Sequence, residues 1–336
     1  MSPNPLIALV TFFLLVLIAT LVVRSKFWKK TSNPDQRKTE VEDILKQLYH
    51  VEYSKRKATL NAMAGALKMS DSKLVGLIEY MTSLNLIQVN DNAIFLTESG
   101  RDYALRIIRV HRLWEKYLSE KTGIHKSEWH QRAEDMEHNL TTDEAEELYR
   151  SLGSPRFDPH GDPIPMKSGE IIETNSIPLS GLDSDVFARI SHIEDEPEVI
   201  YRQIIAKKLH IGQQLVVKSS DDNQVKFKSE GQNYELSVIV ASNISVKPLT
   251  KEETYEAEAV RLSTLKMGEK AKVLGISREC RGANRRRLLD LGFIKGATIE
   301  NGMDGPMKEP KAYKIKNTLI ALRNDQADLI LIEKSA

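Results

Sequence analysis

The hydrophobic pattern of the chain begins with an apolar stretch at residues 6–23 that contains no charged residue. A stretch of this length can just cross a bilayer as a helix. Four basic residues follow it and none precedes it, which places the rest of the chain in the cytoplasm. We therefore predict a transmembrane anchor at residues 5–24, a linker at 25–38, and a single-pass location in the inner (cytoplasmic) membrane. A cleaved signal peptide is the alternative, but the basic segment that normally opens one is missing.

From residue 39 the pattern changes to short amphipathic elements. Apolar residues at helical spacing predict three helices, at 40–51, 59–68 and 72–84. Two short β-type runs, 86–90 and 93–97, meet at the turn-forming sequence Asn-Asp-Asn. This order of helices and hairpin is typical of a winged helix-turn-helix, which we predict for residues 39–99.

The helices predicted within residues 100–165 carry an informative polar pattern. His111 and Glu115 lie four residues apart, so both point from one face of a helix. The next helix has a stripe of four more imidazole and carboxylate side chains: His130, Glu134, Glu137 and His138. Two such stripes facing each other would form a site for a divalent transition metal such as Mn²⁺, Fe²⁺ or Zn²⁺. A polar face exposed to solvent is the alternative interpretation.

Beyond Pro165 the sequence consists of short β-type runs separated by glycines. Residues 185–246 and 263–333 resemble each other as a diverged tandem repeat, and each ends in an apolar strand. We predict two small β-barrels, at 177–249 and 260–334. The predicted fold class is therefore a mainly α-helical N-terminal half followed by two small barrels, with one transmembrane helix before them.

Composition narrows the range of functions. The net charge is +1, so the whole molecule has no electrostatic bias toward nucleic acid. A single cysteine, Cys280, excludes a disulfide framework within the chain and a cysteine-rich zinc module. The sequence shows no nucleophile, acid–base pair or nucleotide-binding loop, so we predict that the protein is not an enzyme. A metal-dependent hydrolase built on the His and Glu residues is the alternative.

The predicted DNA-binding surface is poor in positive charge. The helix at 72–84 offers one cation, Lys73, and the turn of the hairpin offers none. Contacts to phosphates and base edges require such donors. The candidate DNA-binding residues are Lys55, Arg56, Lys57, Ser70, Ser72 and Lys73.

A second basic group lies near the C-terminus, at Arg278, Arg281 and residues 285–287. It would suit contact with acidic lipid or with a loop of a transporter. A solvated helix face is the alternative.

Three motifs together give the chain a family resemblance. They are the sequences His-Arg-Leu-Trp-Glu at 111–115, His-x3-Glu-x2-Glu-His at 130–138, and Asp-Pro-His-Gly-Asp-Pro-Ile-Pro at 158–165. With them, residues 40–165 resemble the diphtheria toxin repressor and manganese transport regulator family of metal-dependent repressors. Residues 265–269 and 287–293 resemble the FeoA domain of ferrous iron uptake systems, and residues 185–246 look like a weaker copy of it.

The resemblance implies a homodimer that binds double-stranded DNA when a metal is bound. It implies metal ligation by Asp43, His111, Glu115, His130, Glu134, Glu137 and His138. Manganese-type members often have a second acid one turn after the position of Asp43, where this chain has Lys46. Iron-type members also take ligands from the segment just before the position of Tyr201. Glu196 and Glu198 lie near that place, but Ile200 occupies a position where an amide is expected.

These observations predict a membrane-anchored, Mn²⁺- or Fe²⁺-dependent transcriptional regulator of metal-ion homeostasis, with residues 100–165 as its metal-binding and dimerisation domain. The alternative is a metal-sensing accessory subunit of a ferrous iron or manganese transporter. In that case the DNA-binding domain would be vestigial.

Overall fold

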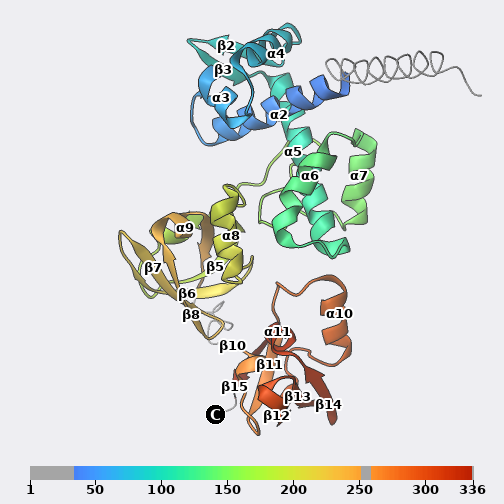
Figure 1. The fold of residues 1–336 in the computed structure, drawn as a ribbon, viewed down its shortest axis with the longest axis vertical. Coiled ribbons are helices and arrows are strands. Elements are labelled where there is room, and N and C mark those ends of the chain that lie inside the picture. Colours follow the sequence, from blue (N-terminus) through green and yellow to red (C-terminus); the bar gives the residue numbers. More distant parts are fainter. Residues whose placement is uncertain (1–33, 251–258, 335–336) are drawn as a thin grey trace, which may run out of the picture. The chain divides into compact units, whose positions relative to one another are not determined.

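The structure is a computed structural model that describes residues 34–250 and 259–334. The chain divides into two compact units, which meet in sequence between Ile108 and Arg109. Figure 1 shows the elements of each unit. One long helix, α5 (Glu98–Lys121), begins in the first unit and continues into the second.

The first unit has the predicted order of helices and strands. Its other elements are α2 (Pro34–Tyr53), β1 (Ala58–Thr59), α3 (Leu60–Ala66), α4 (Asp71–Ser83), β2 (Ile87–Asn90) and β3 (Ala93–Leu96). The apolar faces of the helices pack together, with Ile44, Leu74 and Met81 fully buried. Asp91 and Asn92 both have positive φ, as the tight turn between β2 and β3 requires.

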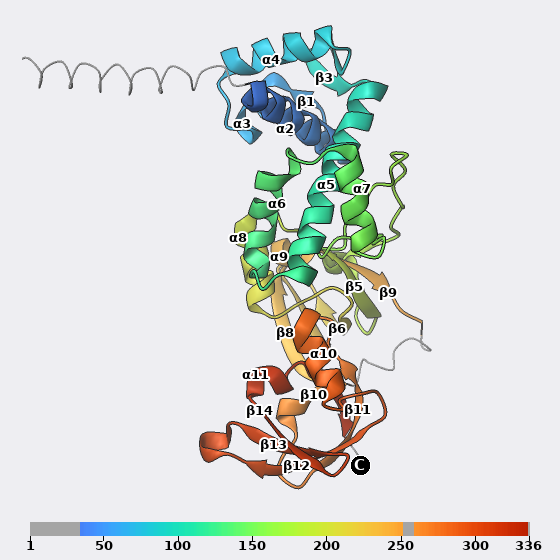
Figure 2. The same ribbon diagram turned by 90° about the vertical axis from the view of Figure 1, so that its right-hand side faces the viewer.

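The second unit opens with a small helical group. It consists of the rest of α5, the 3-10 turn η2 (Lys126–Glu128), α6 (Trp129–Glu137) and α7 (Thr142–Ser151). Both views show α6 and α7 beside α5 (Figures 1 and 2). The apolar cluster here is small, centred on Leu113. Polar contacts support it: Arg109 on α5 donates to the carbonyl oxygen of Pro165 (2.5 Å) and to Glu146 on α7 (2.7 Å).

Two six-stranded antiparallel sheets follow. The first contains β4 (Ile177–Pro178), β5 (Phe187–Ile193), β6 (Gln214–Ser220), β7 (Gln224–Ser229), β8 (Gln232–Ser237) and β9 (Ile244–Pro248). The second contains β10 (Val260–Arg261), β11 (Lys270–Ile276), β12 (Thr298–Asp304), β13 (Lys311–Ile315), β14 (Thr318–Leu322) and β15 (Ile330–Lys334).

The two sheets have the same topology, as the tandem repeat leads one to expect. Their strand orders are β4-β9-β5-β6-β7-β8 and β10-β15-β11-β12-β13-β14. The helices also correspond: α8 (Glu198–Ala206) matches α10 (Gly282–Asp290), and α9 (Val238–Ser242) matches α11 (Asn324–Ala327). Each sheet has its own apolar core, formed around Phe227 in the first and Phe293 in the second.

The prediction of two β-barrels is wrong, because both sheets are open. Among the described residues the edge strands β4 and β8 do not pair, and neither do β10 and β14. Bulges between Ile190 and His192 and between Val273 and Gly275 bend the sheets without closing them. The first strand of each repeat has only two residues, which is too short for the row of hydrogen bonds that closure needs.

The predicted membrane anchor is also corrected. Residues 5–24 lie outside the described residues. Among the helices that the structure does describe, none combines the length and the apolar character needed to cross a membrane. The long helices α2 and α5 both carry charged residues along their length. The membrane-anchored fold class and the single-pass location in the inner membrane therefore have no support in the structure.

Candidate metal centre

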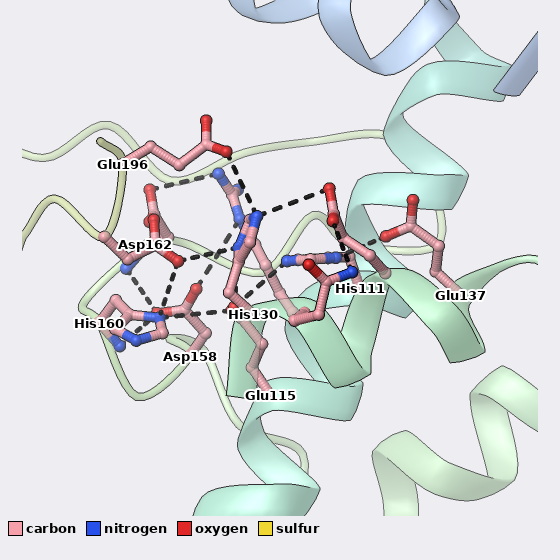
Figure 3. A network of polar contacts seen from close by, with 12 residues as sticks. His111, Glu115, His130, Glu137, Asp158, His160, Asp162 and Glu196 are labelled. Atoms are coloured by element: carbon pink, nitrogen blue, oxygen red, sulfur yellow. Dashed lines mark hydrogen bonds and ion pairs between the residues drawn. The ribbon is translucent and has the colours of Figure 1, made fainter. Parts of the chain in front are cut away.

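The candidate metal centre lies between α5, α6 and the loop that follows β5 (Figure 3). Helix α5 presents His111 and Glu115 from adjacent turns, and α6 presents His130 toward them. The loop after β5 contributes Asp195 and Glu196. His111 and Glu115 are buried, at 7% and 2% exposure. Three segments that are distant in sequence therefore bring imidazoles and carboxylates into one buried place.

Glu115 is at the middle of this group. Its Oε1 lies 3.2 Å from His111 Nε2 and 3.5 Å from His130 Nδ1. One ligand atom from each of these three side chains lies within 4.8 Å of the other two. His130 also faces the loop, with its Nδ1 3.0 Å from Asp195 Oδ2 and its Nε2 3.4 Å from Glu196 Oε1.

The chemistry of these atoms fits a cation. Both ring nitrogens of His130 and Oε1 of Glu115 are buried, yet they form no well-directed hydrogen bond to any described residue. Buried polar atoms normally have such a partner. Nitrogen and oxygen donors that converge without bonding one another can hold a divalent transition metal of intermediate hardness. The residues present therefore fit the metal that the sequence pattern predicts.

The remaining members of the α6 stripe lie beside this group. Glu134 Oε1 is 3.6 Å from His130 Nε2, on the neighbouring turn of α6. Glu137 is buried, and its two carboxylate oxygens face different imidazoles: Oε2 lies 2.5 Å from His111 Nδ1, and Oε1 lies 3.6 Å from His138 Nε2. A carboxylate held on Nδ1 of His111 orients that ring and leaves Nε2 available as a ligand.

The seventh predicted ligand, Asp43, belongs to the other unit. It is half-buried on α2, one turn before Lys46, which is also half-buried. The ligation of metal by Asp43 remains a prediction.

The motif at 158–165 contributes a histidine that the sequence analysis did not include. His160 is buried, and its Nδ1 lies 3.5 Å from Glu115 Oε2 and 3.7 Å from Asp195 Oδ2. Its other nitrogen, Nε2, lies 3.2 Å from the hydroxyl of Tyr201 on α8. Glu115, His160 and Asp195 thus form a second group of three potential ligands that shares Glu115 with the first.

The backbone of the motif fixes His160 in place. Asp158 Oδ1 accepts hydrogen bonds from the backbone N–H groups of His160, Gly161 and Asp162, all at 2.8–2.9 Å. Gly161 has φ +97°, and a Cβ there would lie 2.1 Å from the carbonyl oxygen of Ser191. Only glycine allows this close approach of two backbone segments. The turn that looks like a domain boundary in the sequence is therefore part of the wall of the centre.

The electrostatics of the centre show unbalanced negative charge. Burial opposes a charged imidazole at His130, but the nearby carboxylates of Asp195, Glu115, Glu134 and Glu196 raise its pKa above its usual value. Burial also opposes a charged imidazole at His160, but Glu115 raises the pKa of that imidazole to about 10. Burial would raise the pKa of Glu115, yet the neighbouring imidazoles hold it well below its usual range. Without a metal, protons on the imidazoles balance the carboxylates.

The segment before Tyr201 contributes different side chains from those that the family resemblance suggested. Asp195, which was not a predicted site residue, faces the centre together with Glu196. Glu198 does not; it is exposed and paired with Arg202 on α8 at 2.6 Å. Ile200 packs against the core of the first sheet. The sequence does contain a signal for Asp195 and Glu196, the acidic run Glu-Asp-Glu at 194–196.

The candidate DNA-binding residues lie at the surface of the first unit. Lys55, Arg56 and Lys57 are exposed between α2 and β1, and Ser72 is exposed on the first turn of α4, after the N-cap Ser70. Lys73 Nζ pairs with Glu40 on α2 at 2.7 Å. Their role in DNA binding remains a prediction.

Comparison with protein families separates two parts of the chain. Residues 97–166 match the metal-binding and dimerisation domain of iron-dependent repressors, and residues 260–334 match the FeoA domain. One part of the chain is therefore similar to an iron-dependent repressor domain and another part to a FeoA domain. The first of these regions contains every predicted ligand except Asp43, and the second coincides with the second sheet.

Individual proteins resemble parts of the chain. The iron-dependent repressor IdeR of Mycobacterium tuberculosis is 28% identical over 153 residues, which are 45% of this chain and 65% of that protein. A probable metal transport system membrane protein of Chlamydia trachomatis is 37% identical over 83 residues, 25% of this chain. The chain spans only 18% of that chlamydial relative.

A solved manganese-dependent transcriptional repressor in complex with manganese has a TM-score of 0.58 and 26% identity, covering 62% of this chain and 100% of the other. The predicted class of protein, a metal-dependent repressor that is not an enzyme, agrees with the names of these repressors. The predicted cofactor, a divalent transition metal, agrees with the metals that the names mention.

Proposed function

We propose that the protein is a metal-dependent transcriptional regulator of metal-ion homeostasis. It responds to Mn²⁺ or Fe²⁺, and its site also accepts Zn²⁺. The observation that carries the proposal is the convergence of His111, Glu115 and His130 from two helices of the repressor domain. The names of the similar repressors support the regulatory role. Metal control of DNA binding is the activity that this combination of domains would provide.

The ion would be held by His111, Glu115 and His130, with Asp195 and Glu196 as oxygen donors from the loop after β5. Glu134, Glu137 and His138 would supply further donors beside it, and Asp43 is a further predicted ligand. All of these donors are nitrogen or oxygen, which suits Mn²⁺ and Fe²⁺ better than soft ions. When bound, the metal supplies a compact double positive charge where the free protein relies on protonated imidazoles. Binding therefore releases protons.

Helix α5 offers a route from the metal to the DNA-binding unit. Ala104, near its start, is buried in the core of the first unit, and His111 lies two turns further along. A metal that ties α5 to α6 and to the loop after β5 would favour one arrangement of these segments. The difference in metal affinity between two arrangements would then appear as a difference in DNA affinity, as linkage requires.

The proposed DNA contacts are few. Lys55, Arg56 and Lys57 would contact phosphates, while Ser70, Ser72 and Lys73 would contact the groove at the start of α4. Lys73 must leave Glu40 to do so. Each phosphate contact steepens the salt dependence of binding by about one unit of slope, so we expect a shallow salt dependence.

We also propose that the protein acts as a homodimer. Trp114 and Tyr117 are half-buried on α5, with their rings in edge contact at 5.5 Å, and they are the apolar surface we expect at the interface. Leu118, the next residue on α5, is already buried within the protomer at 4% exposure. It therefore has little surface left to offer a second copy.

The test is DNA retardation by the full chain, with Mn²⁺ or with a chelator, on the DNA upstream of its own gene and on a scrambled duplex of equal length. We expect metal-dependent retardation of the first duplex only, and its loss in Glu115→Gln. Lys207→Gln, an exposed change in the second unit, serves as the control.

Metal binding without any DNA affinity at low salt would contradict the regulatory role. That result would favour the alternative role, an accessory subunit of a metal transporter. Absence of metal binding would contradict both.

A further inference from the structure

The second unit contains a cavity outside the candidate metal centre. Its volume is about 710 Å³, within the range of cavities that hold small ligands. The end of α5, the turn at 157–161, the first sheet and the start of α10 line it. The basic group that the sequence showed at Arg278, Arg281 and 285–287 therefore contributes to a concave site rather than only to a solvated helix face.

The cavity is strongly basic. Seven of its lining residues are lysine or arginine, against two acids, Glu120 and Asp158. Glu120 is paired with Lys116 at 3.0 Å. Asp158 is already engaged: its Oδ1 accepts three backbone N–H groups and its Oδ2 lies 4.0 Å from Arg112 Nε. Most of the positive charge is therefore not balanced by the chain itself.

Arg281 is the most informative of these cations. Its Nη1 is buried and has no hydrogen-bond partner among the described residues. No carboxylate of the described residues forms an ion pair with it; its nearest ring contact is with Trp129, at 5.7 Å. A buried guanidinium N–H without a partner is costly, and a bound acceptor would relieve that cost.

Arg285, by contrast, donates to the carbonyl oxygens of Ile276 and Ser277, at 3.1 and 3.2 Å, and has a structural role.

The lining of the cavity also includes uncharged donors and an imidazole. Thr174, Ser176 and Ser191 line it with hydroxyl groups, and His192 lines it with an imidazole. Ser191 donates to Ser176 Oγ at 2.9 Å, so the two hydroxyls are already ordered. Guanidinium groups and hydroxyls that line one cavity form the usual environment of a phosphate or carboxylate group.

We propose that this cavity binds a small multivalent oxyanion, one that carries phosphate or carboxylate groups. The proposal goes beyond metal-dependent regulation and does not depend on it, since none of the proposed metal ligands lines the cavity. The site does share the turn at 158–161 with the metal centre: Asp158 and Gly161 line the cavity, and His160 between them faces Glu115.

The proposal is tested by calorimetric titration of the metal-free full chain with pyrophosphate, inorganic phosphate and citrate, with chloride as the background anion. We expect saturable binding of at least one of the three at submillimolar concentration. Comparison of the phosphate and citrate titrations tells which oxyanion chemistry the cavity prefers. Metal-free protein is required because pyrophosphate and citrate also chelate Mn²⁺.

Two independent changes should weaken binding at least tenfold. Arg281→Gln with Arg286→Gln removes two cations of the cavity, and Thr174→Glu adds a negative charge to its wall. The matched control is Arg287→Gln, an exposed arginine of the same helix that does not line the cavity, and it should leave affinity unchanged.

No saturable binding of any of these anions up to 10 millimolar, roughly the weak end of useful small-ligand affinity, would overturn the proposal. An equal loss in Arg287→Gln and in the double variant would also overturn it, because general attraction to a basic surface would then explain the binding. Circular dichroism of each variant, unchanged from the parent, ensures that loss of binding reports on the site.

Discussion

Two buried clusters in the second unit contain the same kinds of side chain but differ in how their charge is balanced. In the candidate metal centre, His111, His130 and His160 surround Glu115, with Asp195 beside them. No lysine or arginine of the described residues forms an ion pair with Glu115 or Asp195. Protons on the imidazoles are the available counter-charge there.

The other cluster lies between the two sheets and carries its own cation. Arg261 on β10 pairs with Glu230, in the turn between β7 and β8, at 2.7 Å, and both side chains are buried. His210 lies 3.7 Å from the same carboxylate. Its Nδ1 faces the carbonyl oxygen of Lys208 and must donate to it, so its Nε2 accepts from the Ser277 hydroxyl. The neutral imidazole is fully satisfied.

The pKa values of the two histidines are therefore shifted in opposite directions. Carboxylates raise the pKa of His130, whereas burial lowers the pKa of His210 to about 3. A cluster whose carboxylates are balanced by a fixed guanidinium has no use for a metal. One whose carboxylates are balanced only by exchangeable protons can take a metal in their place. The balance of charge, rather than the residue types, separates the candidate metal centre from a structural polar cluster.

The largest effect should follow from removing the fixed cation. Arg261→Met leaves Glu230 buried without its partner, which should lower the free energy of unfolding by about 3–5 kcal/mol. Denaturant unfolding measures the loss, and the affinity for Mn²⁺ of the folded protein should stay unchanged. Lys228→Met, an exposed change on β7, should have little effect. A loss below about 1 kcal/mol would mean that the Arg261–Glu230 pair is not needed for charge balance.

The next largest effect should come from the carboxylate at the middle of the metal centre. Glu115→Gln removes the oxygen donor that His111, His130 and His160 share, so affinity for Mn²⁺ should fall at least about 100-fold, or roughly 2.7 kcal/mol. Titration with a competing chelator measures it. Glu120→Gln, one turn further along α5, is the matched control and should bind metal normally. Equal affinity for Mn²⁺ in Glu115→Gln and in the parent would show that the metal does not bind at this centre.

Acid should destabilise the fold through His210 in the cluster that contains Arg261 and Glu230. The folded-state pKa of His210, about 3, lies below its ordinary value near 6.5, so the unfolded chain binds the proton first. Its contribution to stability is fully present above pH 6.5 and is lost as the pH falls toward 3.

Between pH 6.5 and 5 this loss amounts to about 2 kcal/mol. His210→Gln should flatten that part of the pH profile, measured by denaturant unfolding in metal-free buffer, whereas His125→Gln, at the surface, should not. An unchanged profile in His210→Gln would show that other groups govern the acid response.

The smallest effect tests the loop after β5. Asp195→Asn should weaken Mn²⁺ binding about tenfold, because it keeps the shape of the side chain but removes its charge. Glu198→Gln, three residues away and exposed, should leave affinity unchanged. Equal effects of the two changes would indicate that the loop attracts the ion only through its general negative charge.

Helical periodicity was sufficient to predict the side chains that α5 and α6 present to the centre. Spacing along a helix fixes direction, so His111, Glu115 and His130 could be expected to meet once the two helices pack together. The contributions of His160 and Asp195 depend on a turn and a loop that fold back from distant parts of the chain. No periodicity encodes such an approach. The acidic run at 194–196 and the histidine inside the motif were the only traces in the sequence.

The sheets show a similar limit. Short strands separated by glycines correctly indicated a repeated β-structure, but whether a sheet closes depends on the length and pairing of its edge strands. Two-residue strands such as β4 and β10 leave almost no trace in a hydrophobic pattern. The membrane segment was predicted from the apolar character of a stretch that lies outside the described residues.

Glu137 connects an imidazole on α5 with one at the end of α6. One of its oxygens faces His111 and the other faces His138. An ion bound to Nε2 of His111 would fix the hydrogen on Nδ1, and the Glu137 carboxylate would accept it there. The same carboxylate then turns its second lone pairs toward His138 in a fixed direction. A metal bound at His111 would therefore also fix the direction in which Glu137 faces His138.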